Sequence, residues 1–333
     1  MVSAREVNEL SSHFPVDAVI RDGKPQVEWL SMPDAEFSEP FFHQTVERAR
    51  RDNEHDSVFT DLETLLQVAK VGPAVQPSGL IFHTSRCGST LVANTCRALD
   101  ATRVIAEAPV IDKLVSRLFT DAGAGSTKEL IYLSLVRAAV HSLSRHPSNA
   151  IARHFVKFAS ASILHVNSLR RAWPNVPCLI LFRDPIEITV SNLRTRPEWM
   201  IPDSNPGAAA AIAGVDVKQL QSMTDEEFCA RALGRYYAAA ESVADQRTTR
   251  LVDYKQLSLQ TLTQILAFFG VTPSAQELTR IERSLLSHAK DPSRSFHPDS
   301  EDKKAAASRQ VIEAVERWAL PAYERLVRHT HGK

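Results

Sequence analysis

One short polar turn contains residues suited to binding an anion. It follows an apolar run, Leu80-Ile-Phe82, that is typical of a strand buried on both faces, and it precedes apolar residues at helical spacing. The turn supplies one fixed cation, one permissive glycine and two hydroxyls: Arg86, Gly88, Ser89 and Thr90. The first N–H groups of a helix lack intrahelical partners and carry the positive end of its dipole. The turn therefore predicts a phosphate or sulfate site, with a plain strand-to-helix connection as the alternative.

A second apolar run also ends in a cation. The segment Cys178-Leu-Ile-Leu-Phe182 is followed by Arg183, and Asp184 and Pro185 suit the N-cap and first turn of a helix. Arg183 is thus placed at the carboxyl end of a strand, where open α/β sheets bind their ligands. Ser191 lies about two turns further along the same helix.

Two further strand ends carry charged residues. A short strand at 102–105 leads to Glu107, and a strand within 150–158 has Lys157 near its carboxyl end. In a doubly wound sheet Glu107 would face the reacting centre beside the anion turn. The alternative is a stabilising charge at the N-terminus of the helix that Pro109 begins. His154 falls on the strand face opposite Lys157 and is expected in the core or at its rim.

At these positions the sequence resembles the sulfotransferase family, whose members use 3′-phosphoadenosine 5′-phosphosulfate (PAPS) as sulfuryl donor. Ser85-Arg-Cys-Gly-Ser-Thr90 is similar to the family's loop for the 5′-phosphosulfate, and Arg183-Asp-Pro with Ser191 is similar to its 3′-phosphate motif. The segment 250–257 is similar to the family's late strand and Tyr-x-x-Leu. The resemblance covers residues 79 to 330 and implies sulfuryl transfer to a hydroxyl or amine of a small-molecule acceptor, with release of PAP and no metal.

The resemblance also implies a role for each candidate residue. Glu107 is expected to be the base, as in tyrosylprotein and several bacterial sulfotransferases, with Arg86 and Lys157 stabilising the leaving phosphate. Donor binding is expected from Ser85, Arg86, Cys87, Gly88, Ser89, Thr90, Arg183, Ser191, Tyr254, Arg294 and Lys303. Cytosolic members carry the base on a Val-Lys-Thr-His run, but Ala159 stands at that histidine position. His83 remains the second candidate for the base.

Two other function classes stay open. A P-loop kinase or NTPase shares the strand, loop and helix, but its Walker pattern has glycine where this chain has His83 and lysine where it has Ser89. A catalytically silent nucleotide-binding protein would keep Arg183 and Ser191 and lose turnover.

Composition narrows the classes of partner. The 333 residues contain 39 Lys plus Arg and 39 Asp plus Glu, so no overall charge favours nucleic acid or a membrane surface. The four cysteines lack the spacing of a zinc site or a disulfide scaffold. No signal-like or membrane-spanning apolar run is found. We therefore expect a cytoplasmic protein.

The expected fold class is α/β: a doubly wound parallel sheet of P-loop/sulfotransferase type, flanked by helices, with an N-terminal hairpin-plus-helix extension. Residues 1–78 are assigned to that extension and 79–333 to the core, and Asp22-Gly23 marks the hairpin turn. The extension is expected to cap the sheet edge, with a wall of the acceptor pocket or a homodimer contact as alternatives. Residues 197–216 are expected to form a mobile lid and 305–329 a single terminal helix.

Overall fold

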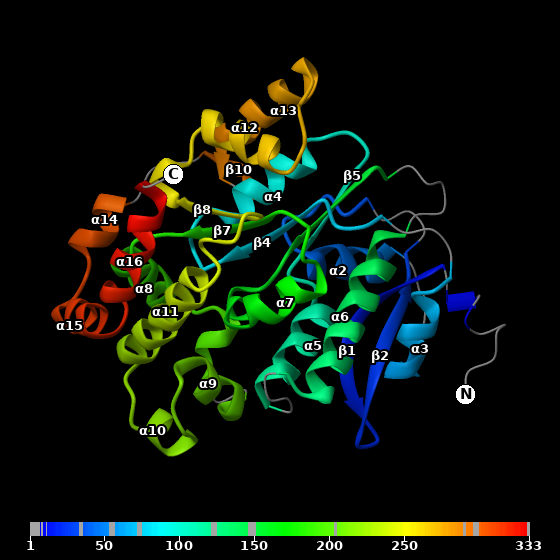
Figure 1. Cartoon of the computed structure of the whole chain (residues 1–333), viewed down its shortest axis with the longest axis horizontal. Helices are drawn as coiled ribbons and strands as arrows, with labels where there is room; N and C mark the ends of the chain where they lie inside the picture. The colour runs from blue at the N-terminus through cyan, green and yellow to red at the C-terminus, as the bar shows by residue number, and fades with distance from the viewer. Residues whose placement is uncertain are drawn as a thin grey trace.

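The structure of the chain is a computed structural model (Figure 1). It describes residues 7, 9–10, 12–32, 36–52, 57–71, 75–120, 125–145, 151–202, 205–288, 291–295 and 300–331. The side chains of residues 118–120, 286–288, 291–295 and 331 are outside this description.

A parallel sheet of five strands forms the centre of the fold. Its strands are β4 (Gly79–His83), β5 (Thr102–Ala106), β6 (Arg153–Lys157), β7 (Cys178–Phe182) and β8 (Thr249–Asp253). Their order in the sheet is β5-β6-β4-β7-β8, and every neighbouring pair is parallel. The chain therefore places β5 and β6 on one side of β4, and it then returns to place β7 on the other side of β4. Such a switch point opens a crevice at the carboxyl ends of the two strands.

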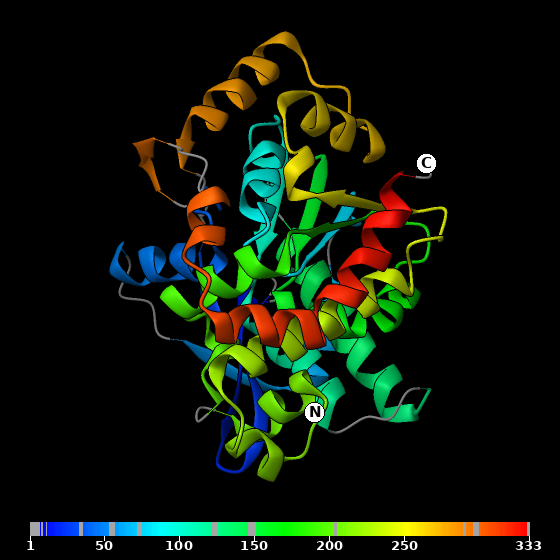
Figure 2. The ribbon, with the colours of Figure 1, turned by 90° about the vertical axis from the view of Figure 1, so that its left-hand side faces the viewer.

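Helices cover both faces of this sheet, as the two views of the ribbon show (Figures 1 and 2). One face packs against α4 (Ser89–Arg97), α12 (Leu259–Phe268) and α13 (Ala275–Leu286). The other face packs against α5 (Pro109–Thr120), α6 (Thr127–Ser144), α7 (Val166–Ala172), α8 (Pro185–Arg194) and α11 (Asp225–Glu241). Within β7, Leu179 and Leu181 pack on the face covered by α4, α12 and α13, and Ile180 packs on the opposite face. This alternation explains why the strands are continuous apolar runs.

The N-terminal extension forms a small antiparallel sheet beside α5 and α6. The hairpin strands β1 (His13–Arg21) and β2 (Lys24–Ser31) pair as predicted, and Asp22 and Gly23 both have positive φ. A third strand that the sequence did not suggest, β3 (Val58–Asp61), pairs with β2. Helices α2 (Phe42–Asp52) and α3 (Leu62–Val68) complete this part. Its apolar side chains join the same core as those of α5 and α6.

Two expectations about the second half of the chain were wrong. Residues 197–216 contain regular structure, in η2 (Glu198–Met200) and α9 (Pro206–Ala213), because prolines fit the first turn of a helix as well as a break. Met200 is fully buried and Trp199 packs on Phe228 and Tyr236, so this segment is part of the core rather than a lid.

The C-terminal region is also divided more finely than expected. In place of one helix it forms α14 (Ser300–Ala305), α15 (Arg309–Trp318) and α16 (Leu320–His331). These helices pack against α8 and α11. The remaining elements are η1 (Ser160–His165), α10 (Val217–Gln221), η4 (Tyr254–Gln256), β9 (Ser287–His288) and β10 (Asp291–Ser295).

Candidate active site

The turn after β4 has a backbone suited to an anion. Ser85, Arg86 and Gly88 all have left-handed conformations, with φ of +72°, +47° and +80°, and successive N–H groups in such a turn line a concavity. Gly88 caps α4 without a side-chain hydrogen bond. No acceptor in the described part of the chain receives the N–H groups of Gly88, Ser89 or Thr90. Because Ser89 and Thr90 are buried, these donors favour a bound anion.

Gly88 allows a prediction about this turn. A Cβ at Gly88 would lie 2.4 Å from Cδ1 of Leu257 and 3.1 Å from the Tyr254 ring, in addition to the left-handed φ. We expect Gly88→Ala to lower the free energy of unfolding by about 2–4 kcal/mol. The matched control is Gly23→Ala, since Gly23 has φ of +71° and a Cβ there would meet no atom within 4 Å; it should cost about 1–2 kcal/mol. Urea unfolding of both variants measures the difference, and equal losses would contradict the close contact.

Arg183, directly after β7, lies against this turn. Its Nη1 donates to the carbonyl oxygen of Arg86 at 3.3 Å, and its Cζ lies 3.9 Å from the centre of the Tyr254 ring. The same ring would contact a Cβ on Gly88. The structure thus brings four of the predicted donor-binding residues, Arg86, Gly88, Arg183 and Tyr254, into one cluster at the β4/β7 switch point.

The Arg183 guanidinium is also held by groups that the sequence did not suggest. Its Nε donates to Oε2 of Glu187 at 2.6 Å and its Nη2 to the hydroxyl of Ser300 on α14 at 3.1 Å. Arg183 is 4% exposed and Glu187 1%. Lys304 places its Nζ 3.7 Å from carboxylate oxygens of both Glu187 and Asp184. The predicted 3′-phosphate residue therefore forms a buried ion pair with Glu187, and the exposed Lys304 lies at the outer side of this pair.

Glu107 lies at the same edge of the sheet, one residue after β5. Register places Ala106 opposite Lys157, and the side chains of Glu107 and Lys157 form an ion pair. Oε1 of Glu107 also lies 3.4 Å from Nε2 of His83. Burial alone would raise the pKa of Glu107, but the Lys157 ammonium and the contact with His83 hold it well below its usual range. Glu107 is therefore a carboxylate at neutral pH.

Asn192 and Asp112 are site neighbours absent from the set of candidates. The Oδ1 of Asn192, which is fully buried on α8, accepts from the Ser85 hydroxyl at 3.2 Å and from Nε of Arg86 at 3.3 Å. Asp112 on α5 accepts from the N–H of Ala159 at 3.3 Å. Burial, followed by the nearby Glu107 charge, raises the pKa of Asp112 well above its usual range. Neither residue belongs to a recognisable motif, and the only available signal was a polar residue in an apolar helical pattern.

The other predicted residues differ in their surroundings. The Cys87 thiol turns inward to the carbonyl of Leu181 at 3.3 Å, so only its backbone faces the turn. Lys303 is buried on α14, and the side chain of Arg294 lies outside the described residues. Ser191 is half-buried on α8, and its hydroxyl makes no hydrogen bond to another described residue. Of the two positions expected for His154, the structure has the core: the side chain is fully buried, and burial lowers its pKa to about 3.

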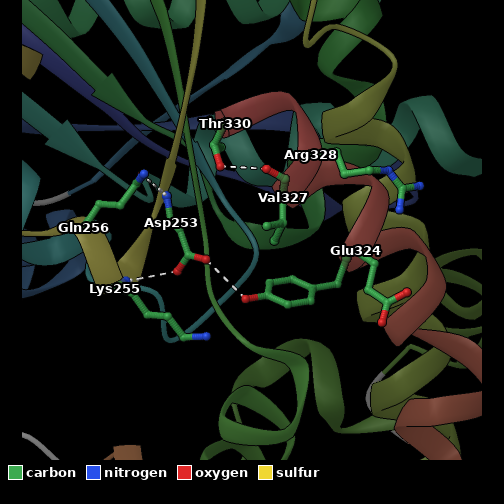
Figure 3. Close-up of a pocket in the computed structure, with 8 residues that line it drawn as sticks. Asp253, Lys255, Gln256, Glu324, Val327, Arg328 and Thr330 are labelled. Carbon is green, nitrogen blue, oxygen red and sulfur yellow. Dashed lines mark hydrogen bonds between the residues drawn. The ribbon is translucent and has the colours of Figure 1, made fainter. Parts of the chain in front are cut away.

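A pocket of about 460 Å³ lies between η4 and α16 (Figure 3). Asp253 forms its inner wall and accepts hydrogen bonds from the N–H of Lys255 and the hydroxyl of Tyr323, at 3.0 and 3.1 Å. The pocket includes none of the predicted site residues, although Tyr254 follows Asp253 directly. Its exposed rim carries both charge signs, on Lys255, Glu324 and Arg328.

Within the described residues, no group of three or more His, Cys, Asp or Glu side chains is arranged to hold a metal ion. In the same part of the chain, no helix is both long and apolar enough to cross a bilayer.

Comparison with known proteins gives matches among solved structures only. No family model and no curated protein matches the sequence. Solved structures similar to the chain include a sulfotransferase from Alicyclobacillus acidocaldarius, with 16% identity, a TM-score of 0.43 and coverage of 78% of this chain and 97% of that one. The sulfotransferase domain from the curacin biosynthetic pathway has 12% identity, a TM-score of 0.41 and coverage of 78% and 99%. A Mycobacterium avium sulfotransferase has 13% identity, a TM-score of 0.44 and coverage of 80% of both chains. All three of these structures are sulfotransferases.

Proposed function

We propose that this protein is a sulfotransferase that moves a sulfuryl group from PAPS to a hydroxyl or amine of a small-molecule acceptor. The observation that carries the proposal is the meeting of the anion-binding turn, Arg183 and the Glu107–Lys157 pair at one edge of the sheet. Two separate groups for anions suit a nucleotide with phosphates at two positions. A carboxylate beside them suits removal of a proton from an acceptor.

The chain's own residues fit such a donor. The amides of Gly88, Ser89 and Thr90, with Arg86, would hold the 5′-phosphosulfate, since these amides lack protein acceptors in the described region. Arg183 and Ser191 would hold the 3′-phosphate, in competition with Glu187. Tyr254 would contact the nucleotide between them. PAPS supplies the sulfuryl group when bound.

The catalytic roles follow from charge. By analogy with phosphoryl transfer, the reaction needs alignment and stabilisation of the negative charge that develops on the leaving phosphate. Arg86, the turn amides and Lys157 would provide that stabilisation, and Glu107 would accept the proton of the acceptor.

The ion pair links these roles. In the structure, Lys157 lowers the pKa of Glu107 and so weakens it as a base. When Lys157 turns toward an anionic donor, the pKa of Glu107 rises toward the range in which a carboxylate removes protons more effectively. Glu107 would thus become a stronger base once the donor is present. A cytoplasmic location and a homodimer stay predictions from the sequence.

A thermal-shift comparison of PAP, ADP and AMP without Mg²⁺ tests the proposal. PAP at one hundred times its Kd should stabilise the protein by about 2.7 kcal/mol, and more than equal concentrations of ADP or AMP, because only PAP has a 3′-phosphate. Formation of PAP from PAPS with a panel of alcohols and amines then tests transfer. Equal shifts with PAP and ADP would remove the 3′-phosphate assignment, and Mg²⁺-dependent ATP hydrolysis would favour the kinase or NTPase class. Preferential PAP binding without any transfer would indicate the catalytically silent class.

A further inference from the structure

His83 contacts both the anion-binding turn and Glu107. It ends β4 and is 6% exposed. Its Nδ1 accepts a hydrogen bond from the N–H of Ser85 at 3.2 Å, and its Nε2 lies 3.4 Å from Oε1 of Glu107. The ring therefore bridges the turn and the proposed base.

These contacts determine the protonation of the ring. A backbone N–H can only donate, so Nδ1 must present its lone pair to Ser85, and the single proton of the neutral imidazole is on Nε2. That proton faces the Glu107 carboxylate. With the Nδ1 lone pair accepting from Ser85 and Nε2 protonated, the neutral ring has no site for a proton from an acceptor. His83 is thus poorly placed as the base.

We propose that His83 is a positioning residue that orients the Glu107 carboxylate and ties it to the anion-binding turn. The inference rests on the proposed function, in which Glu107 takes the acceptor's proton. Glu107 has a left-handed backbone, with φ of +54°, a conformation that persists in a residue other than glycine only where the surrounding contacts enforce it. Other groups that influence its charge are Lys157 on β6, Arg86 on the turn and Asp112 on α5, with Glu198 acting on Asp112.

Three substitutions separate the two contacts of the ring. In His83→Gln the side-chain NH₂ can replace Nε2–H toward Glu107, whereas in His83→Asn the shorter amide oxygen can replace only Nδ1 toward Ser85. His83→Ala removes both. We expect His83→Gln to retain kcat within about 3-fold. In the Asn and Ala variants kcat should fall about 10-fold, less than the roughly 10²-fold cost of a 1 Å misplacement, because Glu107 keeps its ion pair with Lys157. PAP affinity should stay within about 2-fold in all three, since the turn amides remain.

Two measurements do not depend on turnover. Nitrogen-15 NMR of labelled histidine should show His83 protonated at Nε2 only, with its signal assigned by its loss in His83→Gln. Carbon-13 NMR should show the pKa of the Glu107 carboxyl rising in the Asn and Ala variants and remaining near the wild-type value in the Gln variant. The pKa rises because the carboxylate loses a hydrogen-bond donor.

The outcomes are distinguishable. Protonation of His83 at Nδ1, or Gln, Asn and Ala variants with the same Glu107 pKa and the same loss of kcat, would overturn the inference and leave the sulfotransferase proposal standing. Absence of any transfer from PAPS by the wild type, with the expected tautomer and pKa changes, would overturn the proposed function and support the contact between His83 and Glu107.

Discussion

Replacing Glu107 by Gln is expected to lower kcat for sulfuryl transfer by about 10²-fold or more, because the amide cannot take the acceptor's proton. PAP affinity should equal or exceed that of the wild type, since the turn amides and Arg183 keep their positions and Lys157 no longer pairs with a carboxylate. Initial rates at saturating PAPS measure the first effect, and calorimetric titration with PAP measures the second. Full activity in this variant would assign proton removal to another group or to water.

Asp112→Asn is the matched control for Glu107→Gln. Asp112 is a second, partly buried carboxyl near the ion pair, and its burial, followed by the Glu107 charge, raises its pKa well above its usual range. Asn is similar in size to Asp and can still accept from the N–H of Ala159. Its kcat should therefore be close to the wild-type value. A large loss in Asp112→Asn would mean that removing any carboxyl here disturbs the site.

The Glu107→Gln variant should also be less stable at neutral pH, and the pH dependence has a defined sign. Lys157 is 2% exposed, and a buried charge without its partner costs about 3–5 kcal/mol. The pKa of Glu107 is lowered by folding, so its contribution is present above the unfolded pKa, about 4.3, and is lost as pH falls through the folded pKa. The difference in melting temperature between wild type and variant should thus shrink as pH falls below about 4.

The central fold could be predicted because each of its signals is local. A strand buried on both faces is a continuous apolar run, and the residues that follow strands β4 and β7 belong to recognisable turns. Asp184 caps α8 by accepting from the N–H of Ile186, as its position before Pro185 indicated. The carboxyl ends of parallel strands share one edge, so the sequence also indicated which charged residues would be neighbours.

What the sequence did not indicate depends on contacts between distant segments. Strand β3 is four residues long and is stabilised by pairing with β2. The role of Asn192 depends on its packing over a turn more than 100 residues earlier. Likewise, the sequence does not distinguish Glu187 from an ordinary helical residue. Its role depends on the hydrogen bonds that its carboxylate accepts from Arg183 and from Ser300 of α14. Pair distances of this kind cannot be read from spacing along the chain.

The Arg183–Glu187 pair determines how the 3′-phosphate assignment must be tested. Arg183→Ala alone should weaken PAP binding by about 2–3 kcal/mol, or about 30- to 150-fold, the scale of a strong charge-assisted hydrogen bond. The same substitution leaves Glu187 buried without its main partner, which would destabilise the fold. The double variant Arg183→Met/Glu187→Gln removes both charges and retains most of the volume. A loss of PAP affinity in this variant therefore reports the missing contact with the 3′-phosphate and not an unpaired buried carboxylate.

Glu187→Gln alone is the control that isolates the guanidinium. It keeps Arg183, whose Nη groups still donate to Arg86 and Ser300, and removes the carboxylate that competes with a phosphate. We therefore expect it to bind PAP as tightly as the wild type or more tightly, while the double variant shows the full loss. AMP, which lacks the 3′-phosphate, should bind the double variant and the wild type equally well in calorimetric titrations. A double variant that loses PAP and AMP affinity in parallel would show that Arg183 supports the turn or the adenosine rather than the 3′-phosphate, because the two nucleotides share the adenosine and the 5′-phosphate and differ only in the 3′-phosphate.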